Sequence, residues 1–124
     1  MNVVDSSGWL AYFAGTRNAE AFAEPIERPS ELVVPTLTLF EVYERVLVQR
    51  GESDALRAVS IMRRGSRPAP LGASSAIAAA RISVETGLPL ADAVILATAQ
   101  AYDALLWTQD ADFQGMERVE YRAP

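Results

Sequence analysis

Cysteine and histidine are both absent from the 124 residues, and lysine is absent as well, so all eleven basic residues are arginines. Without thiol or imidazole groups the chain cannot use a cysteine nucleophile, a Ser-His-Asp triad or the common zinc ligands. The lack of lysine excludes a P-loop, a Schiff base and the lysine-bearing pocket of a phosphoacceptor receiver domain. Any catalysis must therefore use carboxylates, hydroxyls, arginine and an oxygen-ligated ion.

Long hydrophobic runs are absent too. The most apolar stretch, residues 91–101, is interrupted by Asp92 and is too short to span a bilayer. Met1 leads directly into a predicted strand, with no charged segment followed by an apolar one, so we expect no secretory signal, no membrane association and a cytoplasmic protein. The net charge of −5 argues against nucleic-acid binding driven by overall charge, but not against a local basic groove.

Short apolar and β-rich runs alternate with helical patterns along the chain, which predicts one α/β domain over residues 1–124. In such an α/β domain we expect the strands to run mainly parallel. The run at 66–71 carries two prolines and therefore suits only an edge position. The expected strands are 1–5, 32–35, 66–71, 105–108 and 119–121, and the expected helices are 8–14, 19–24, 36–48, 53–62, 73–85 and 88–99.

Two capping patterns offer structural explanations for polar residues near helix starts. Ser6 and Ser7 are predicted to cap the helix that begins at Gly8, because a hydroxyl can accept a bond from a free N–H of the first turn. Thr38 and Glu41 have capping-box spacing. If this capping box forms, it explains the presence of an acid at Glu41 without a functional role.

Four acids occupy equivalent places in the predicted elements. Asp5 and Asp110 each follow an apolar strand, and Glu41 and Asp92 each lie in the opening turns of an apolar helix. Strand C-termini and the starts of the following helices share one edge of a parallel sheet, so the four carboxylates can converge. Clustered carboxylates repel one another, and Mg²⁺ or Mn²⁺ removes that cost because both ions prefer oxygen ligands. A purely structural alternative is that Asp92 is stabilised by the helix dipole and has no role in a site.

The same residues carry a family resemblance over essentially the whole chain. Val3-Val4-Asp5-Ser6-Ser7, Glu41, Leu90-Ala91-Asp92-Ala93 and Leu106-Trp107-Thr108-Gln109-Asp110-Ala111-Asp112-Phe113 together resemble the PIN-domain family, and within it the VapC-like ribonuclease toxins of toxin–antitoxin pairs. The resemblance implies an α/β protein with a three-layer α/β/α fold and a central, mainly parallel sheet of four to five strands. It also implies metal-dependent cleavage of RNA at an acidic site matching Asp5, Glu41, Asp92 and Asp110. It further implies an accessory acid at Asp112 and supporting hydroxyls at Ser6 and Thr108.

Three hypotheses follow for the function. The leading one is a Mg²⁺/Mn²⁺-dependent endoribonuclease in which Asp5, Asp92 and Asp110 bind the metal and Glu41 holds a water on it or a second ion. The second is a non-catalytic PIN-like module that binds RNA or protein, which the repulsive acid cluster disfavours. The third is a phosphohydrolase acting on small phosphate esters, but the sequence after Asp5 lacks the second acid of an Asp-x-Asp motif.

Six arginines lie in the middle third of the chain and raise the question of an RNA path: Arg45, Arg50, Arg57, Arg63, Arg64 and Arg67. Such a run is usually a solvated helix face. If these arginines border the acidic site, they can instead form a groove that binds phosphates. Arg45, Arg63 and Arg64 are the residues expected to bind RNA. The resemblance also implies a homodimer held inactive by a small antitoxin, an expectation supported by the many aromatic residues of the first two predicted helices.

Overall fold

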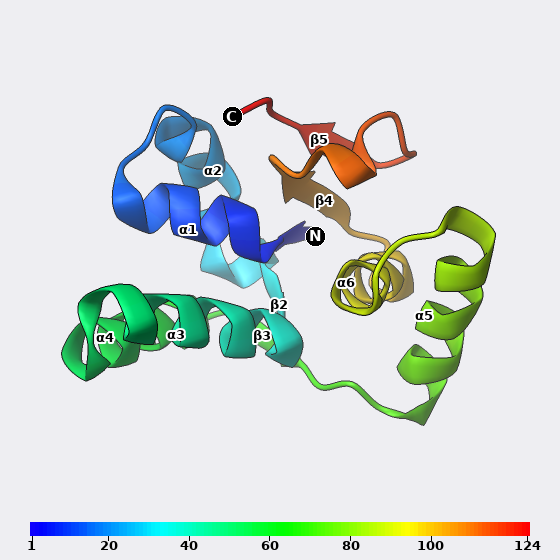
Figure 1. The fold of residues 1–124 in the computed structure, drawn as a ribbon, viewed down its shortest axis with the longest axis horizontal. Helices are drawn as coiled ribbons and strands as arrows, with labels where there is room; N and C mark the ends of the chain where they lie inside the picture. The colour runs from blue at the N-terminus through cyan, green and yellow to red at the C-terminus, as the bar shows by residue number, and fades with distance from the viewer.

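The strands are short, and every pairing between them is parallel. In the computed structural model, which describes residues 1–124, β1 (Asn2–Val4), β4 (Leu105–Thr108) and β5 (Val119–Tyr121) form a sheet in the order β1-β4-β5 (Figure 1). β2 (Val33–Pro35) pairs with β3 (Arg67–Ala69). A parallel bridge between Asn2 and Leu32 joins the two sheets along β1 and β2. The predicted strands are all present, and the proline-containing β3 lies at an edge as expected.

The predicted helices also form, with ends moved by a few residues. Their bounds are α1 Ser6–Ala14, α2 Ala19–Ile26, α3 Thr36–Arg50, α4 Glu52–Arg63, α5 Ala73–Thr86 and α6 Leu90–Ala101, with 3-10 turns η1 Pro29–Glu31 and η2 Ala111–Phe113. No single helix is long and apolar enough to cross a membrane. Helices α5 and α6 pass that test only as a pair, which bends by 116° at the break between them.

Alternating side chains along the strands divide the apolar residues into two cores. Val3, Val33 and Leu106 pack with α5 and α6, whereas their neighbours Val4, Val34 and Trp107 pack with α1 to α4. Successive strand residues point to opposite faces, so a sheet that is apolar at both positions must be covered on both sides. The three-layer arrangement is confirmed, with α5 and α6 on one side of the sheet and α1 to α4 on the other (Figure 1).

Both predicted caps are wrong, for different reasons. Asp5 is the N-cap of α1 and accepts a bond from the Gly8 N–H, so Ser6 and Ser7 lie inside the helix. Helix α3 begins at Thr36, directly after Pro35, and no side chain caps it. Thr38 is therefore past the helix start, where its buried hydroxyl has no hydrogen-bond partner. Glu41 does not belong to a capping box and is available to the site.

The first two helices pack tightly against the sheet. A Cβ added at Gly8 would lie 2.6 Å from a Val4 methyl and 3.0 Å from the Phe22 ring, so only glycine permits this approach. Trp9 and Phe22 are buried in the core of this protomer. The aromatic residues that suggested a dimer therefore pack largely against the core of their own chain. The exposed apolar side chains lie elsewhere, including Phe40 and Val48 on α3.

Candidate active site

Asp5 lies at the carboxyl end of β1, and its side chain is only 2% exposed. One carboxylate oxygen, Oδ1, accepts from the Ser7 hydroxyl at 2.7 Å and the Gly8 N–H at 3.0 Å. The other, Oδ2, accepts only from the Thr108 hydroxyl, at 2.7 Å. A carboxylate oxygen has two lone pairs, so Oδ2 keeps one that no protein group uses. Burial raises the pKa of Asp5, these hydrogen bonds lower it, and the charge of Asp110 raises it further.

Thr108 connects Asp5 to the next acid. Its hydroxyl donates to Asp5 and accepts from the Asp110 N–H at 2.9 Å. Ser7 makes a second link, because its hydroxyl donates to Asp5 and accepts from the Gln109 N–H at 3.3 Å. The ends of β1 and β4 are therefore held in one network of hydroxyls around a buried carboxylate.

We predict that Thr108→Val lowers the free energy of unfolding by about 1–3 kcal/mol, since it removes a donor from a buried carboxylate and an acceptor from a main-chain N–H. Thr98→Val is the matched control, because buried Thr98 donates only to the Val94 carbonyl of its own helix. Urea denaturation of both variants measures the difference. Equal losses in the two variants would mean that the network around Asp5 adds nothing beyond a buried hydroxyl.

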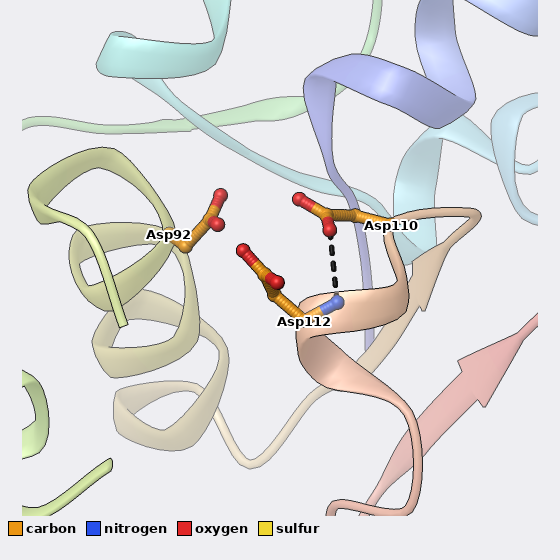
Figure 2. Close-up of side chains that lie close together, drawn as sticks. All are labelled: Asp92, Asp110 and Asp112. Carbon is orange, nitrogen blue, oxygen red and sulfur yellow. Dashed lines mark hydrogen bonds between the residues drawn. The ribbon is translucent and has the colours of Figure 1, made fainter. Parts of the chain in front are cut away.

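Three further carboxylates meet beside this network. Asp92 lies in the first turn of α6, Asp110 precedes η2 and Asp112 lies within it, and oxygens of the three side chains lie within 4.8 Å of one another (Figure 2). Asp110 caps η2 by accepting from the Asp112 N–H at 2.9 Å. That turn brings Asp112 round to face Asp92 (Figure 2). Asp112, expected only as an accessory acid, is thus a full member of the cluster, whereas Asp5 is not one of the three.

Glu41 reaches the same region from α3. Its Oε1 is buried without a hydrogen-bond partner. Burial raises the pKa of Glu41, the Ser6 hydroxyl partly offsets that rise, and the charges of Asp5 and Glu44 add to it. Ser6 therefore acts on Glu41, while the hydroxyl that supports Asp5 from α1 belongs to Ser7.

The electrostatics of the cluster fit a divalent cation. Burial, followed by the charges of four neighbouring carboxylates, raises the pKa of Asp92 to about 7; these neighbours are Asp110, Asp5, Asp112 and Glu41. None of the five acids forms an ion pair, since the salt bridges of the chain involve Asp54, Asp103 and Glu120. Three converging carboxylates without a paired cation are a donor set of the kind that a hard divalent cation prefers.

The raised pKa of Asp92 predicts a pH-dependent stability without metal. In the folded state Asp92 holds its proton up to about pH 7, whereas the unfolded chain releases it near the ordinary value of 3.8. Between these values the folded state binds more protons, so its stability falls as pH rises. Asp92→Asn should remove this contribution. Urea denaturation in EDTA should therefore show wild type losing stability relative to Asp92→Asn from pH 4 to 7, and parallel curves would contradict the assignment.

The PIN domain family profile matches residues 3–119, which include all five acids. The chain belongs to the PIN domain family. No curated protein sequence matches it.

Solved structures agree with this assignment. A toxin–antitoxin complex from Klebsiella pneumoniae contains a chain that is 26% identical, with a TM-score of 0.80 over 97% of this PIN domain and 96% of that chain. VapC20 of Mycobacterium tuberculosis, a sarcin-ricin loop cleaving toxin, is 18% identical, with a TM-score of 0.77 over 94% and 95%. DNA-bound VapBC from Salmonella typhimurium is 13% identical, with a TM-score of 0.75 over 98% of each chain. At their low identities the last two establish the fold alone.

The arginines expected to bind RNA separate into two places on this PIN domain. Arg45 lines a groove together with Ser6, Ser7 and Gln109, which are sequence neighbours of Asp5 and Asp110. Arg63 lines a separate apolar hollow with Phe40 and Leu47, and Arg64 follows the end of α4. Arg45 is therefore the only one of the three that the fold brings to the groove, and the role of the other two stays a prediction.

Sequence reasoning missed Asn18 and Gln109. The Asn18 side-chain NH₂ donates to Oε1 of Gln109 at 3.1 Å and to the Ala123 carbonyl at 2.8 Å. Gln109 sits between Thr108 and Asp110 in the sequence, which is a signal that it borders the site. Nothing in the sequence indicates that Asn18, ninety-one positions away, contacts it.

Proposed function

We propose that this PIN domain is an endoribonuclease that hydrolyses RNA phosphodiester bonds in a Mg²⁺- or Mn²⁺-dependent reaction. One observation carries the proposal: oxygens of Asp92, Asp110 and Asp112 lie within 4.8 Å of one another, and no arginine pairs with them. A cluster with this much self-repulsion is costly unless a cation occupies it. The family membership and the VapC20 fold support the same reading.

Each acid has a distinct part in this proposal. Asp92, Asp110 and Asp112 would hold the ion, and Asp5 Oδ2 keeps a lone pair that no protein group uses. When bound, such an ion supplies an activated water and neutralises charge on the phosphodiester. The unpaired Oε1 of Glu41 can accept a proton from the attacking water, because the raised pKa of Glu41 makes it a better base than an ordinary carboxylate.

The products of cleavage test the proposed chemistry. A chain without histidine lacks the usual base for activating the ribose 2′-hydroxyl, so we expect water to be the nucleophile. Cleavage of a structured RNA should then leave a phosphate on one fragment and a hydroxyl on the other, with no 2′,3′-cyclic phosphate. Mass spectrometry of the fragments distinguishes these ends. Cyclic phosphate as the initial product would contradict hydrolysis by water.

We further propose that the protein is the toxin of a toxin–antitoxin pair, acts in the cytoplasm as a homodimer and is inhibited by a small partner. The likeness to the Klebsiella pneumoniae toxin–antitoxin complex supports the partner. The exposed apolar side chains of Phe40 and Val48 give limited support to an interface. The product of an adjacent small open reading frame should block RNA cleavage when added in stoichiometric amounts. Light scattering that shows only monomer at every workable concentration would exclude the homodimer.

A further inference from the structure

A groove of about 670 Å³ lies between α1, α3 and α4. Among the residues that line it are Ser6, Ser7 and Gln109, which lie next to Asp5 and Asp110 in the sequence. None of the five site acids lines the groove itself, but the groove borders the chain segments that carry Asp5 and Asp110.

The charge of the groove suits a polyanion. Three arginines line it, and only Arg50 is paired, with Asp54 at 3.2 Å. Arg45 and Arg57 make no salt bridge, so their guanidinium groups are free to grip phosphate oxygens. Leu10 and Phe13 supply an apolar wall against which bases can pack. A single-stranded nucleic acid combines these two requirements.

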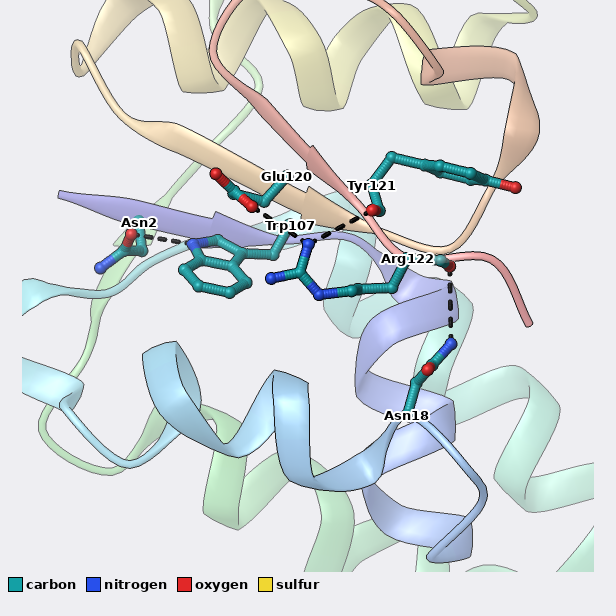
Figure 3. Close-up of polar contacts among 6 residues, drawn as sticks. All are labelled: Asn2, Asn18, Trp107, Glu120, Tyr121 and Arg122. Carbon is teal, nitrogen blue, oxygen red and sulfur yellow. Dashed lines mark hydrogen bonds and ion pairs between the residues drawn. The ribbon is translucent and has the colours of Figure 1, made fainter.

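The amide of Gln109 has a defined orientation in the groove lining. The C-terminal segment is fixed because the Arg122 guanidinium pairs with Glu120 at 3.1 Å and lies 5.9 Å from the centre of the Trp107 ring (Figure 3). Its carbonyls, at 2.8 Å for Ala123, can only accept, so the Asn18 group that faces them is NH₂. The Gln109 atom that faces the same NH₂, at 3.1 Å, must then be the acceptor Oε1.

This orientation leaves the Gln109 Nε2 without a partner inside the protein. We propose that an RNA strand lies along the groove, with its backbone held beside the cleavage site by the Nε2 protons of Gln109 and the guanidinium of Arg45. Asn18 is a positioning residue, since it touches no substrate and acts by turning the Gln109 amide. The inference rests on the proposed ribonuclease function and names the residues that bind its substrate.

Variants of Gln109 test whether its Nε2 group donates a hydrogen bond to RNA. Gln109→Glu keeps the oxygen that bonds Asn18 and replaces the NH₂, and Gln109→Met removes the donor without adding charge. Each should raise the KM for RNA about tenfold, the effect of one lost hydrogen bond to a charged group. The rise in melting temperature caused by Mn²⁺ should remain in Gln109→Met, which separates RNA binding from metal binding. Asn18→Asp should also raise KM, because Gln109 then turns its NH₂ toward the new carboxylate.

Arg45→Ala tests the groove itself. It should weaken RNA binding by an Asp92→Asn background protein and lower the salt slope of binding by about one unit. Arg81→Ala is the matched control, because Arg81 lies on α5 and is exposed without a salt bridge. Its affinity and slope should equal those of the background protein.

Two results would overturn the inference alone. The first is that the wild-type protein cleaves RNA while Gln109→Met keeps the wild-type KM and Arg45→Ala keeps the salt slope of its background protein. The other is a loss of inhibition by a protein partner in these variants with RNA binding unchanged, which would make the groove a protein-docking surface. Failure of the wild-type protein to cleave any RNA would instead overturn the proposed function together with this inference.

Discussion

Replacing Asp92 with asparagine should reduce RNA cleavage at least about a hundredfold, because loss of a metal ligand is expected to exceed the effect of removing an outer-shell partner. Asp92 contributes an oxygen to the three-carboxylate cluster, and its pKa of about 7 reflects burial and four neighbouring acids. Asparagine keeps the shape and removes the charge. Single-turnover cleavage of labelled RNA in Mn²⁺ measures the loss, and Asp5→Asn should show a similar one.

The control for this prediction is Asp103→Asn. Asp103 is an exposed acid outside the cluster, paired only loosely with Arg118 at 3.7 Å, so its replacement should leave cleavage at the wild-type rate. Asp92→Asn should also be at least as heat-stable as wild type in metal-free buffer above pH 7, since one repulsive charge is gone. Full cleavage by Asp92→Asn with saturating metal would show that Asp92 is not an active-site residue.

Mn²⁺ should raise the melting temperature of the wild-type protein by roughly 10 °C at a concentration about a hundred times its dissociation constant, since only the folded chain assembles the site. The rise should be reversed by EDTA. It should be largely lost in Asp92→Asn and in Asp110→Asn, because each removes one of the three clustered carboxylates. Asp103→Asn should keep it. An equal rise in all four proteins would indicate that the ion binds elsewhere.

The layout of the fold and of the acids could be predicted because both depend on short local patterns. Val3 and Val4 lead directly into Asp5, and Leu106 and Trp107 lead through Thr108 toward Asp110. A parallel sheet places such strand ends on one edge whatever the details of packing. Asp92 follows the same logic from the start of α6. These residues meet as expected.

The parts that could not be predicted depend on atoms brought together by packing. Ser6 and Ser7 are suitable caps by residue type, but the Asp5 carboxylate accepts from the Gly8 N–H and is the N-cap of α1. The spacing of Thr38 and Glu41 suggested a capping box, yet α3 starts two residues earlier. Asp112 enters the cluster only because η2 turns it toward Asp92. Asn18 contacts both Gln109 and the C-terminal segment, and no local sequence pattern places either beside it.

The central claim is that one cluster of carboxylates binds a divalent ion and thereby cleaves RNA. The most direct test is to strip the protein with EDTA and measure single-turnover RNA cleavage while Mn²⁺ is titrated back, with an identically purified Asp92→Asn sample beside it. The account predicts no cleavage without metal, saturable activation by Mn²⁺ in the wild-type protein, and no activation in the variant. Cleavage that persists in EDTA, or that rises equally in both samples, would contradict it.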